Sequence, residues 1–186
     1  MLGSFFADRD LCGVSGNDGL LRFHDAESGP IAQEAVEATF GKLGVRADVF
    51  AFDWRARQYA ISSSFDADGR YSGGDEPATI VALDPFDMAI EPWGMAVEDF
   101  ERAVMLPAVQ EGLRPEPFAR WRAAQGVPPL TLAQCAGATV PGFYGGEVDL
   151  GNLELNDVDV YLTFFAQLWQ RAREQKPGDP APRLEV

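Results

Sequence analysis

Few of the residue types that perform catalysis occur in this chain of 186 residues. It has a single histidine, His24, and two cysteines, Cys12 and Cys135, which lie far apart with no CxxC spacing. Asp25 follows His24, but adjacent residues of a strand point to opposite faces, so a Ser-His-Asp arrangement has no support. No spacing of His, Cys, Asp and Glu matches a metal site. We therefore expect no catalytic residues, no metal and no cofactor, and hence a protein that is not an enzyme.

The chain also lacks any run of about 18 uncharged apolar residues. Its first residues, MLGSFFADRD, do not place a basic segment before an apolar one. We expect neither a membrane span nor a signal peptide, and we predict a cytoplasmic protein. In that reducing compartment the two cysteines are expected to be buried thiols rather than a disulfide.

Basic side chains are scarce as well. The 15 Lys and Arg residues face 29 Asp and Glu residues, which gives a net charge of −14 at pH 7. Such a surface is a poor partner for nucleic acid, because nucleic-acid binding depends on neutralising phosphates. An acidic surface accelerates encounter with basic proteins, but it also serves plain solubility. The hydrophobic content of 46% is that of a globular protein.

Apolar alternation predicts a sheet in the first half of the chain. SGNDG, residues 15–19, favours a tight turn between two short apolar segments, and the sequence DPFD, residues 84–87, separates another such pair. The predicted strands are residues 11–14, 20–23, 49–53, 58–61, 80–83 and 88–91. They form an antiparallel β-meander of about four to six strands. Pro30 and Gly41 bracket one predicted helix, residues 31–41.

The second half of the sequence is mostly helical by the same criteria. Helices are predicted at residues 97–105 and 117–124, a loop with one strand within 131–140, and a long final helix at 157–175 with Asn156 as its N-cap. One stripe of the final helix is apolar and comprises Val158, Tyr161, Leu162, Phe165, Leu168, Trp169 and Ala172. The predicted fold class is α+β: an antiparallel meander in the N-terminal half, packed against a mostly helical C-terminal half that ends in a long amphipathic helix.

Val160 and Phe164 do not fit this stripe. They project about 80 to 120° from its centre, beside Gln167 and Arg171. Either another segment of the chain covers them or they form an exposed strip that binds a partner. We keep both interpretations open and take Val160 and Phe164 as candidate partner-binding residues.

A polar, glycine-rich segment, residues 62–77, lies between two predicted hairpins and is expected to be a long loop. A calcium loop that began at Asp66 would need glycine and glutamate where Tyr71 and Pro77 stand, so the calcium interpretation fails. Aromatic side chains ringed by acids suit a basic partner. The segment supplies six candidate partner-binding residues: Phe65, Asp66, Asp68, Tyr71, Asp75 and Glu76.

Two groups of residues resemble a known family. The first comprises Val140-Pro141, Phe143, Gly145-Gly146-Glu147, Asn152-Leu153-Glu154, Asp157 and Val160-Tyr161. It resembles the C-terminal domain of bacterial type VI secretion DNase-immunity proteins. The second comprises the hairpin from Gly16 to His24 and the residues Phe50-Ala51-Phe52-Asp53-Trp54-Arg57-Gln58, and it resembles the GAD-like domain that accompanies it. The resemblance spans residues 8–173.

This resemblance implies a GAD-like β-rich region at residues 1–95, an immunity-type α-rich region at 96–176 and a flexible tail at 177–186. It also implies a cytoplasmic immunity protein that neutralises a toxin, a basic nuclease, by occlusion. The sequence departs from the family pattern in the length and acidity of the 62–77 loop and at Phe164-Phe165, both of which are places where partner choice can be encoded. An enzyme or small-ligand protein with a pocket between the meander and the helical half is the alternative. A scaffold without a toxin partner is a third hypothesis.

Overall fold

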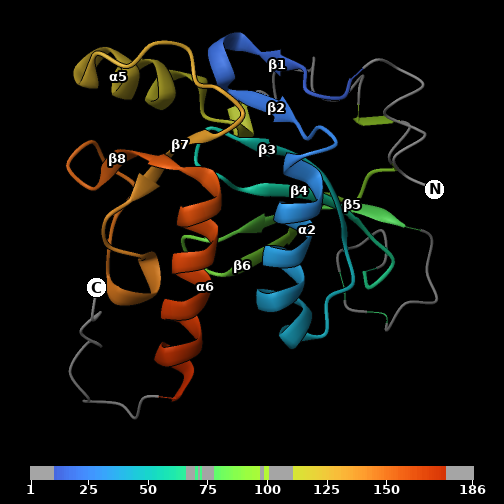
Figure 1. The fold of residues 1–186 in the computed structure, drawn as a ribbon. Helices are drawn as coiled ribbons and strands as arrows, with labels where there is room; N and C mark the ends of the chain where they lie inside the picture. The colour runs from blue at the N-terminus through green and yellow to red at the C-terminus, as the bar shows by residue number, and fades with distance from the viewer. Residues whose placement is uncertain are drawn as a thin grey trace.

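The computed structural model describes residues 11–65, 70, 72, 78–96, 99–100 and 111–174. A six-stranded antiparallel sheet, in which each strand pairs with the next along the chain, forms the first half (Figure 1). Its strands are β1 (Ser15–Gly16), β2 (Leu21–Phe23), β3 (Asp48–Asp53), β4 (Gln58–Ser62), β5 (Thr79–Asp84) and β6 (Ala89–Pro92). This is the predicted meander, and the α+β fold class is confirmed.

Helices and a small second sheet complete the fold. Helices α2 (Ser28–Thr39) and α6 (Val158–Glu174) lie side by side and run in the same direction in front of the sheet in Figure 1. Helix α5 (Pro115–Gln125) lies near the β1 end of the sheet, and β7 (Gln134–Ala138) pairs with β8 (Leu153–Asp157). Short 3-10 helices occupy η1 (Asn17–Gly19), η2 (Gly41–Leu43) and η3 (Gly142–Tyr144).

One hydrophobic core joins the two halves of the chain. The buried indole of Trp54, just after β3, lies 5.3 Å from the ring of Phe118 and 6.1 Å from that of Trp121, centroid to centroid, and both of these belong to α5. The amide of Ala136 in β7 donates a hydrogen bond of 2.7 Å to the carbonyl of Trp54. The regions predicted at 1–95 and 96–176 therefore contribute side chains to the same core.

Several predicted boundaries are corrected. Strand β8 is absent from the prediction, although Leu153 and Leu155 alternate with Glu154 and Asn156, because the strand is short and ends in residues typical of a helix start. The N-cap of α6 is Asp157 rather than Asn156, since its Oδ1 accepts hydrogen bonds from the amides of Asp159 (3.0 Å) and Val160 (3.1 Å). Strand β1 begins at Ser15, later than the predicted strand 11–14. Most of the predicted helix 97–105 lies outside the described residues.

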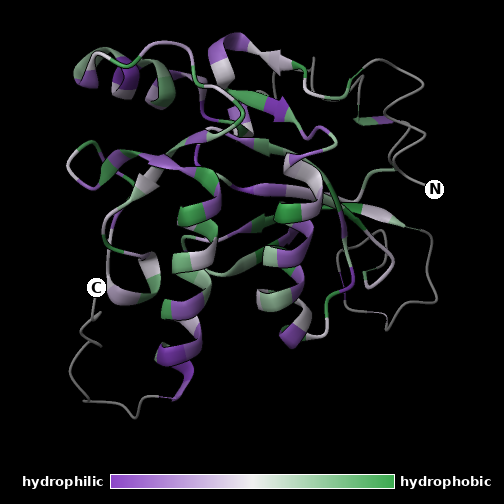
Figure 2. Ribbon diagram, viewed as in Figure 1, coloured by the Kyte–Doolittle hydropathy of each residue, from purple (hydrophilic) through white to green (hydrophobic). Residues whose placement is uncertain are grey.

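The hydropathy of α6 changes along its length. Figure 2 shows apolar residues in its first turns and hydrophilic residues in its last turn, where Arg171 and Arg173 lie. Most of its predicted apolar stripe is buried, whereas Trp169 is only half-buried. Within the described part of the chain, no helix combines the length and the apolar character that crossing a membrane requires.

Candidate functional site

The loop before β8 contains most residues of the C-terminal motif, and Asn152 closes it. The Asn152 Oδ1 accepts hydrogen bonds from the Thr139 hydroxyl (2.7 Å) and the Val140 amide (2.8 Å). Its Nδ2 donates to the carbonyls of Val140 (2.8 Å) and Glu147 (2.9 Å). The buried amide side chain thus satisfies backbone groups on both sides of the loop. Asn152 therefore stabilises the conformation of this loop.

Two glycines allow the same loop to pack closely. A Cβ atom on Gly146 would overlap the carbonyl oxygen of Val140, and one on Gly142 would overlap the carboxylate of Asp87. The Gly142 amide also donates to the Phe86 carbonyl at 3.0 Å, which fastens the loop to the turn between β5 and β6. Only glycine permits backbones and side chains to approach this closely.

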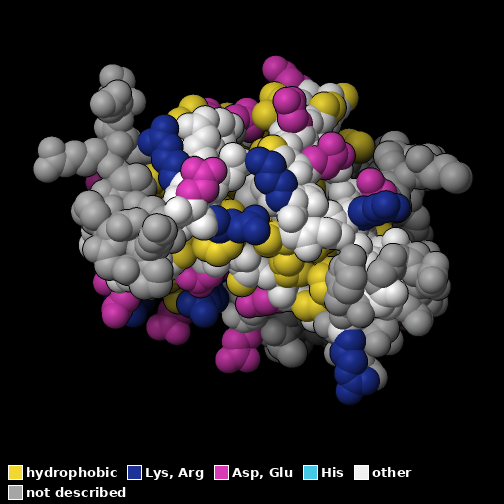
Figure 3. All heavy atoms as spheres, turned by 90° about the horizontal axis from the view of Figure 1, so that it is seen from below, with side chains coloured by type: hydrophobic (Ala, Val, Ile, Leu, Met, Phe, Trp, Pro, Cys, Tyr) yellow, Lys and Arg dark blue, Asp and Glu magenta, His cyan; other side chains and the backbone are white. Residues whose placement is uncertain are grey.

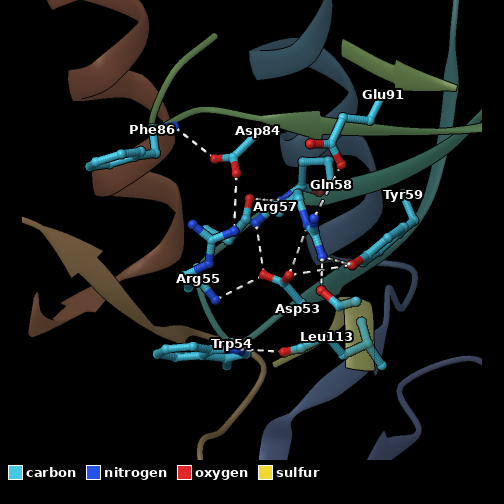
Figure 4. A network of polar contacts seen from close by, with 12 residues as sticks. Asp53, Trp54, Arg55, Arg57, Gln58, Tyr59, Asp84, Phe86, Glu91 and Leu113 are labelled. Atoms are coloured by element: carbon cyan, nitrogen blue, oxygen red, sulfur yellow. Dashed lines mark hydrogen bonds and ion pairs between the residues drawn. The ribbon is translucent and has the colours of Figure 1, made fainter. Parts of the chain in front are cut away.

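Buried charges occupy the turn between β3 and β4 (Figure 4). The Asp53 carboxylate accepts from the Arg57 Nε at 3.0 Å and from the amides of Arg55 (2.9 Å) and Arg57 (3.1 Å). The Arg57 guanidinium also donates to the hydroxyl of Tyr59 and the carbonyl of Gly112, both at 2.8 Å. Burial alone would lower the pKa of Arg57, but Asp53, with smaller contributions from Tyr59, Asp84 and Glu91, outweighs that effect, and the pKa is raised. Arg57 is therefore a permanent cation, held in place by its partners.

A second ion pair extends the network towards β5. The Arg55 Nη2 lies 3.0 Å from the Asp84 Oδ2, and the Asp84 Oδ1 accepts from the Phe86 amide at 3.0 Å. Burial raises the pKa of Tyr59 well above its usual value, so this phenol stays protonated. Each charged group of this turn contacts a partner of opposite charge. The network is suited to holding the turn rather than to binding a ligand.

Arg22 in β2 is fully buried, and no carboxylate of the described residues forms an ion pair with it. Its guanidinium donates to the carbonyls of Thr131 (2.7 Å), Gln134 and Asp53 (2.8 Å), and it stacks 4.2 Å from the centroid of the Phe52 ring. Burial lowers the pKa of Arg22 to about 10. Arg22 joins the sheet to the chain before β7, which is a structural contact.

His24, Ser28 and Asp25 do meet at the start of α2, but in an order that gives no catalytic triad. The Ser28 hydroxyl lies 3.2 Å from the His24 Nδ1 and 2.9 Å from the Asp25 Oδ1, so serine stands between the other two. The His24 Nε2 lies 2.9 Å from the Gln58 Oε1, and burial lowers the pKa of His24. A triad needs the imidazole between the hydroxyl and the carboxylate.

Metal ligands show no clustering in the part of the chain that the structure describes. No group of three or more His, Cys, Asp or Glu side chains there is arranged to hold a metal ion. Cys135 is buried, as expected, and burial raises the pKa of its thiol to about 12, whereas Cys12 is exposed. Neither cysteine forms a disulfide.

The candidate partner-binding residues differ in their exposure to solvent, and several of them lie outside the described residues. Val160 is 65% exposed and Phe164 is 36% exposed, so the described residues leave this strip of α6 open to solvent. Phe65 is only 8% exposed and packs in the core, which does not match the exposed aromatic anchor we expected. Five further candidates lie outside the described residues: Asp66, Asp68, Tyr71, Asp75 and Glu76.

The two ends of α6 differ in charge. Asp157 and Asp159 stand at its start, and burial, then the nearby Asp157 and Glu27, raise the pKa of Asp159. Arg171 and Arg173 stand in its last turn. Figure 3 looks from below Figure 1, at the side where α2 and α6 end, and it shows Lys and Arg side chains among hydrophobic patches, with many acids towards the rim. The strip therefore borders acids at its Val160 end and bases at its Arg171 end.

A hollow of about 600 Å³ lies between the meander and the helical half. Trp54 and Leu153 line it, together with Pro117 and Arg120 of α5 and the turn at residues 148–151. None of these residues is predicted from the sequence as a pocket residue, although a pocket at this boundary is one of the alternatives. Three distant segments supply the lining, so no local spacing marks it.

These observations define an acidic α+β protein whose motif residues hold loops in place and whose α6 displays apolar side chains. No family model matches the chain, and comparison with curated proteins finds no match. The chain is similar in fold to Atu4351 from Agrobacterium tumefaciens, whose crystal structure superimposes with a TM-score of 0.53. The two are 16% identical over 81% of this chain and 68% of Atu4351. At that identity the likeness concerns the fold alone.

Proposed function

We propose that this protein is a cytoplasmic immunity protein, which binds a bacterial secreted toxin and neutralises it without performing chemistry. The toxin is a type VI secretion nuclease with a basic substrate groove, as the family resemblance implies. The outward strip of α6, Val160 and Phe164, carries the proposal together with the loop at residues 62–77.

The exposure of Val160 and Phe164 is the observation that supports a partner most directly. Six other residues of α6 are buried: Val158, Tyr161, Leu162, Phe165, Ala166 and Leu168. The helix thus has a complete inward face without Val160 and Phe164. An exposed aromatic beside an exposed β-branched residue contributes little to folding but supplies the kind of anchor that protein interfaces use.

The charge distribution fits a basic partner. The net charge of −14 attracts a cationic surface over a distance, and the strip begins beside Asp157 and Asp159. Such attraction raises the association rate, whereas desolvated apolar anchors lengthen the time that the complex persists. A nuclease groove needs basic side chains to bind phosphates. An acidic surface that covers this groove competes with the nucleic acid, so the mechanism is occlusion.

The decisive experiment is a rescue assay. Each reading frame beside the gene for this protein is expressed in a bacterial host, and viable counts are compared with and without this protein. We expect one neighbour to be toxic and its toxicity to disappear on co-expression. If no neighbour is toxic, or if a toxic one is not neutralised, the immunity role is wrong.

The contact surface is tested with the double variant Val160→Ser/Phe164→Ser. We expect it to remain folded, to bind the toxin at least about tenfold more weakly and to lose rescue, because the anchors are gone. Ile31→Ser is the matched control, since Ile31 of α2 is exposed but does not belong to the strip. Full rescue by the double variant would assign binding to the 62–77 loop instead.

A second function is favoured by the hollow between the meander and α5. Its volume is within the range of small-ligand sites, roughly 300–1,000 Å³, and much of its lining is apolar. This arrangement supports a small-ligand protein, the alternative to the immunity role.

A further inference from the structure

The hollow beside Trp54 combines an apolar floor with two opposite charges at its rim. Trp54 and Leu153 are buried, and Pro117 with Val148 and Leu150 provides apolar walls. Arg120 on α5 and Asp149 on the facing turn are exposed and line the same hollow. They are the two charged residues among its lining.

Arg120 and Asp149 do not form an ion pair with each other. The ion pairs of the described residues do not include Arg120 or Asp149. The Asp149 Oδ1 accepts from the amides of Gly151 (2.8 Å) and Asn152 (3.0 Å), which shapes the turn and leaves Oδ2 for another donor. Among the described residues the guanidinium of Arg120 has no hydrogen-bond acceptor, and it can bind a carboxylate through two N–H groups.

We infer that the hollow binds a free amino acid with a bulky apolar side chain. The carboxylate pairs with Arg120, the ammonium group pairs with Asp149, and the side chain lies against Pro117, Val148 and Leu150. Trp54 and Leu153 form the buried layer behind these residues. A neutral apolar molecule would leave both rim charges unpaired, and a simple anion would be repelled by Asp149. The inference deepens the small-ligand function and is independent of the immunity role, which depends on α6.

The dimensions agree with an aromatic amino acid. The hollow, about 600 Å³, is open on one side, so it accommodates an indole ring and still retains water around the charged end. The ligand is therefore expected to be bound weakly, since its charged groups stay close to solvent.

Calorimetric titration of the full chain with three related molecules tests the inference. L-tryptophan carries both charges, indole-3-propionate lacks the ammonium group and tryptamine lacks the carboxylate. We expect L-tryptophan to bind roughly five- to tenfold more tightly than either analogue, because each analogue loses one charge-assisted hydrogen bond.

Two variants test which residue pairs with each charged group of the ligand. Arg120→Gln should weaken L-tryptophan binding but not tryptamine binding, whereas Asp149→Asn should weaken L-tryptophan binding but not indole-3-propionate binding. Asparagine keeps the Oδ1 acceptor that the turn requires. Arg173→Gln, at the far end of α6, is the control and should change nothing.

Equal affinities for the three molecules would show that the hollow does not recognise the charged groups. That result would overturn the inference but leave a ligand pocket in place. A complete lack of binding by all three molecules would overturn both the inference and the small-ligand function. Neither result bears on the rescue assay, so failure of this inference and failure of the immunity role are distinguishable.

Discussion

The β3–β4 turn and the outer face of α6 both place side chains in environments that are unfavourable in free energy. The two regions differ in what surrounds those side chains. Asp53, Arg55 and Arg57 are charged and buried, and each has a partner within 3.0 Å. Val160 and Phe164 are apolar and exposed, and the described residues do not cover them. Buried charges with complete partners stabilise a fold. Exposed apolar groups on a helix whose inward face is already complete contribute little to the fold, and they form the surface of the proposed interface.

The largest effect is expected from Asp53→Ala. It leaves the Arg57 guanidinium buried beside no carboxylate except the more distant Glu91, at 3.4 Å, and it removes an acceptor from two amides. The expected loss in free energy of unfolding is about 3–5 kcal/mol, measured by urea denaturation. Asp48→Ala, an exposed site on the same strand, should change stability by less than about 0.5 kcal/mol. Equal losses would show that the network is not a special stabiliser of the turn.

A smaller effect is expected from Gly146→Ala, which tests whether the C-terminal motif is structural. The new methyl group would overlap the Val140 carbonyl, and the loop would have to move away from Asn152. Such overpacking costs about 1–3 kcal/mol. Gly41→Ala is the control, because no atom lies within 4 Å of the added Cβ. If thermal denaturation gives both variants the parent's melting temperature, the close approach at Gly146 does not constrain this loop.

The smallest effect on stability is expected from Phe164→Ala. Because the ring is exposed, its loss should lower the free energy of unfolding by less than about 1 kcal/mol. Phe165→Ala removes the adjacent buried ring, which lies 4.1 Å from that of Tyr161, and should cost about 3–5 kcal/mol. Chemical denaturation of the pair decides the matter. Similar losses would mean that the outer face of α6 is part of the core and is not a binding surface.

Sequence reasoning located the sheet well because its signals are local. Strands β3 to β6 are short apolar segments separated by polar turns or loops, and both long helices carry apolar stripes. It missed β8, a short strand whose last residues are typical of a helix start, and it misplaced the N-cap of α6, because the neighbouring Asn156 and Asp157 are both good caps. It also treated Phe65 as an exposed anchor, since a polar neighbourhood in sequence does not reveal a buried ring.

The sequence by itself determined the fold class, the acidic surface and the two apolar residues that do not belong to the inward stripe of α6. These follow from composition and from helical periodicity, which need no knowledge of distant neighbours. The tertiary structure decided which motif residues are structural and where a hollow forms. The Asn152 side chain binds backbone groups up to 12 residues away, and the hollow joins Trp54 to α5 and to the turn at residues 148–151. Such contacts depend on how separated segments pack, and no short stretch of sequence encodes that packing.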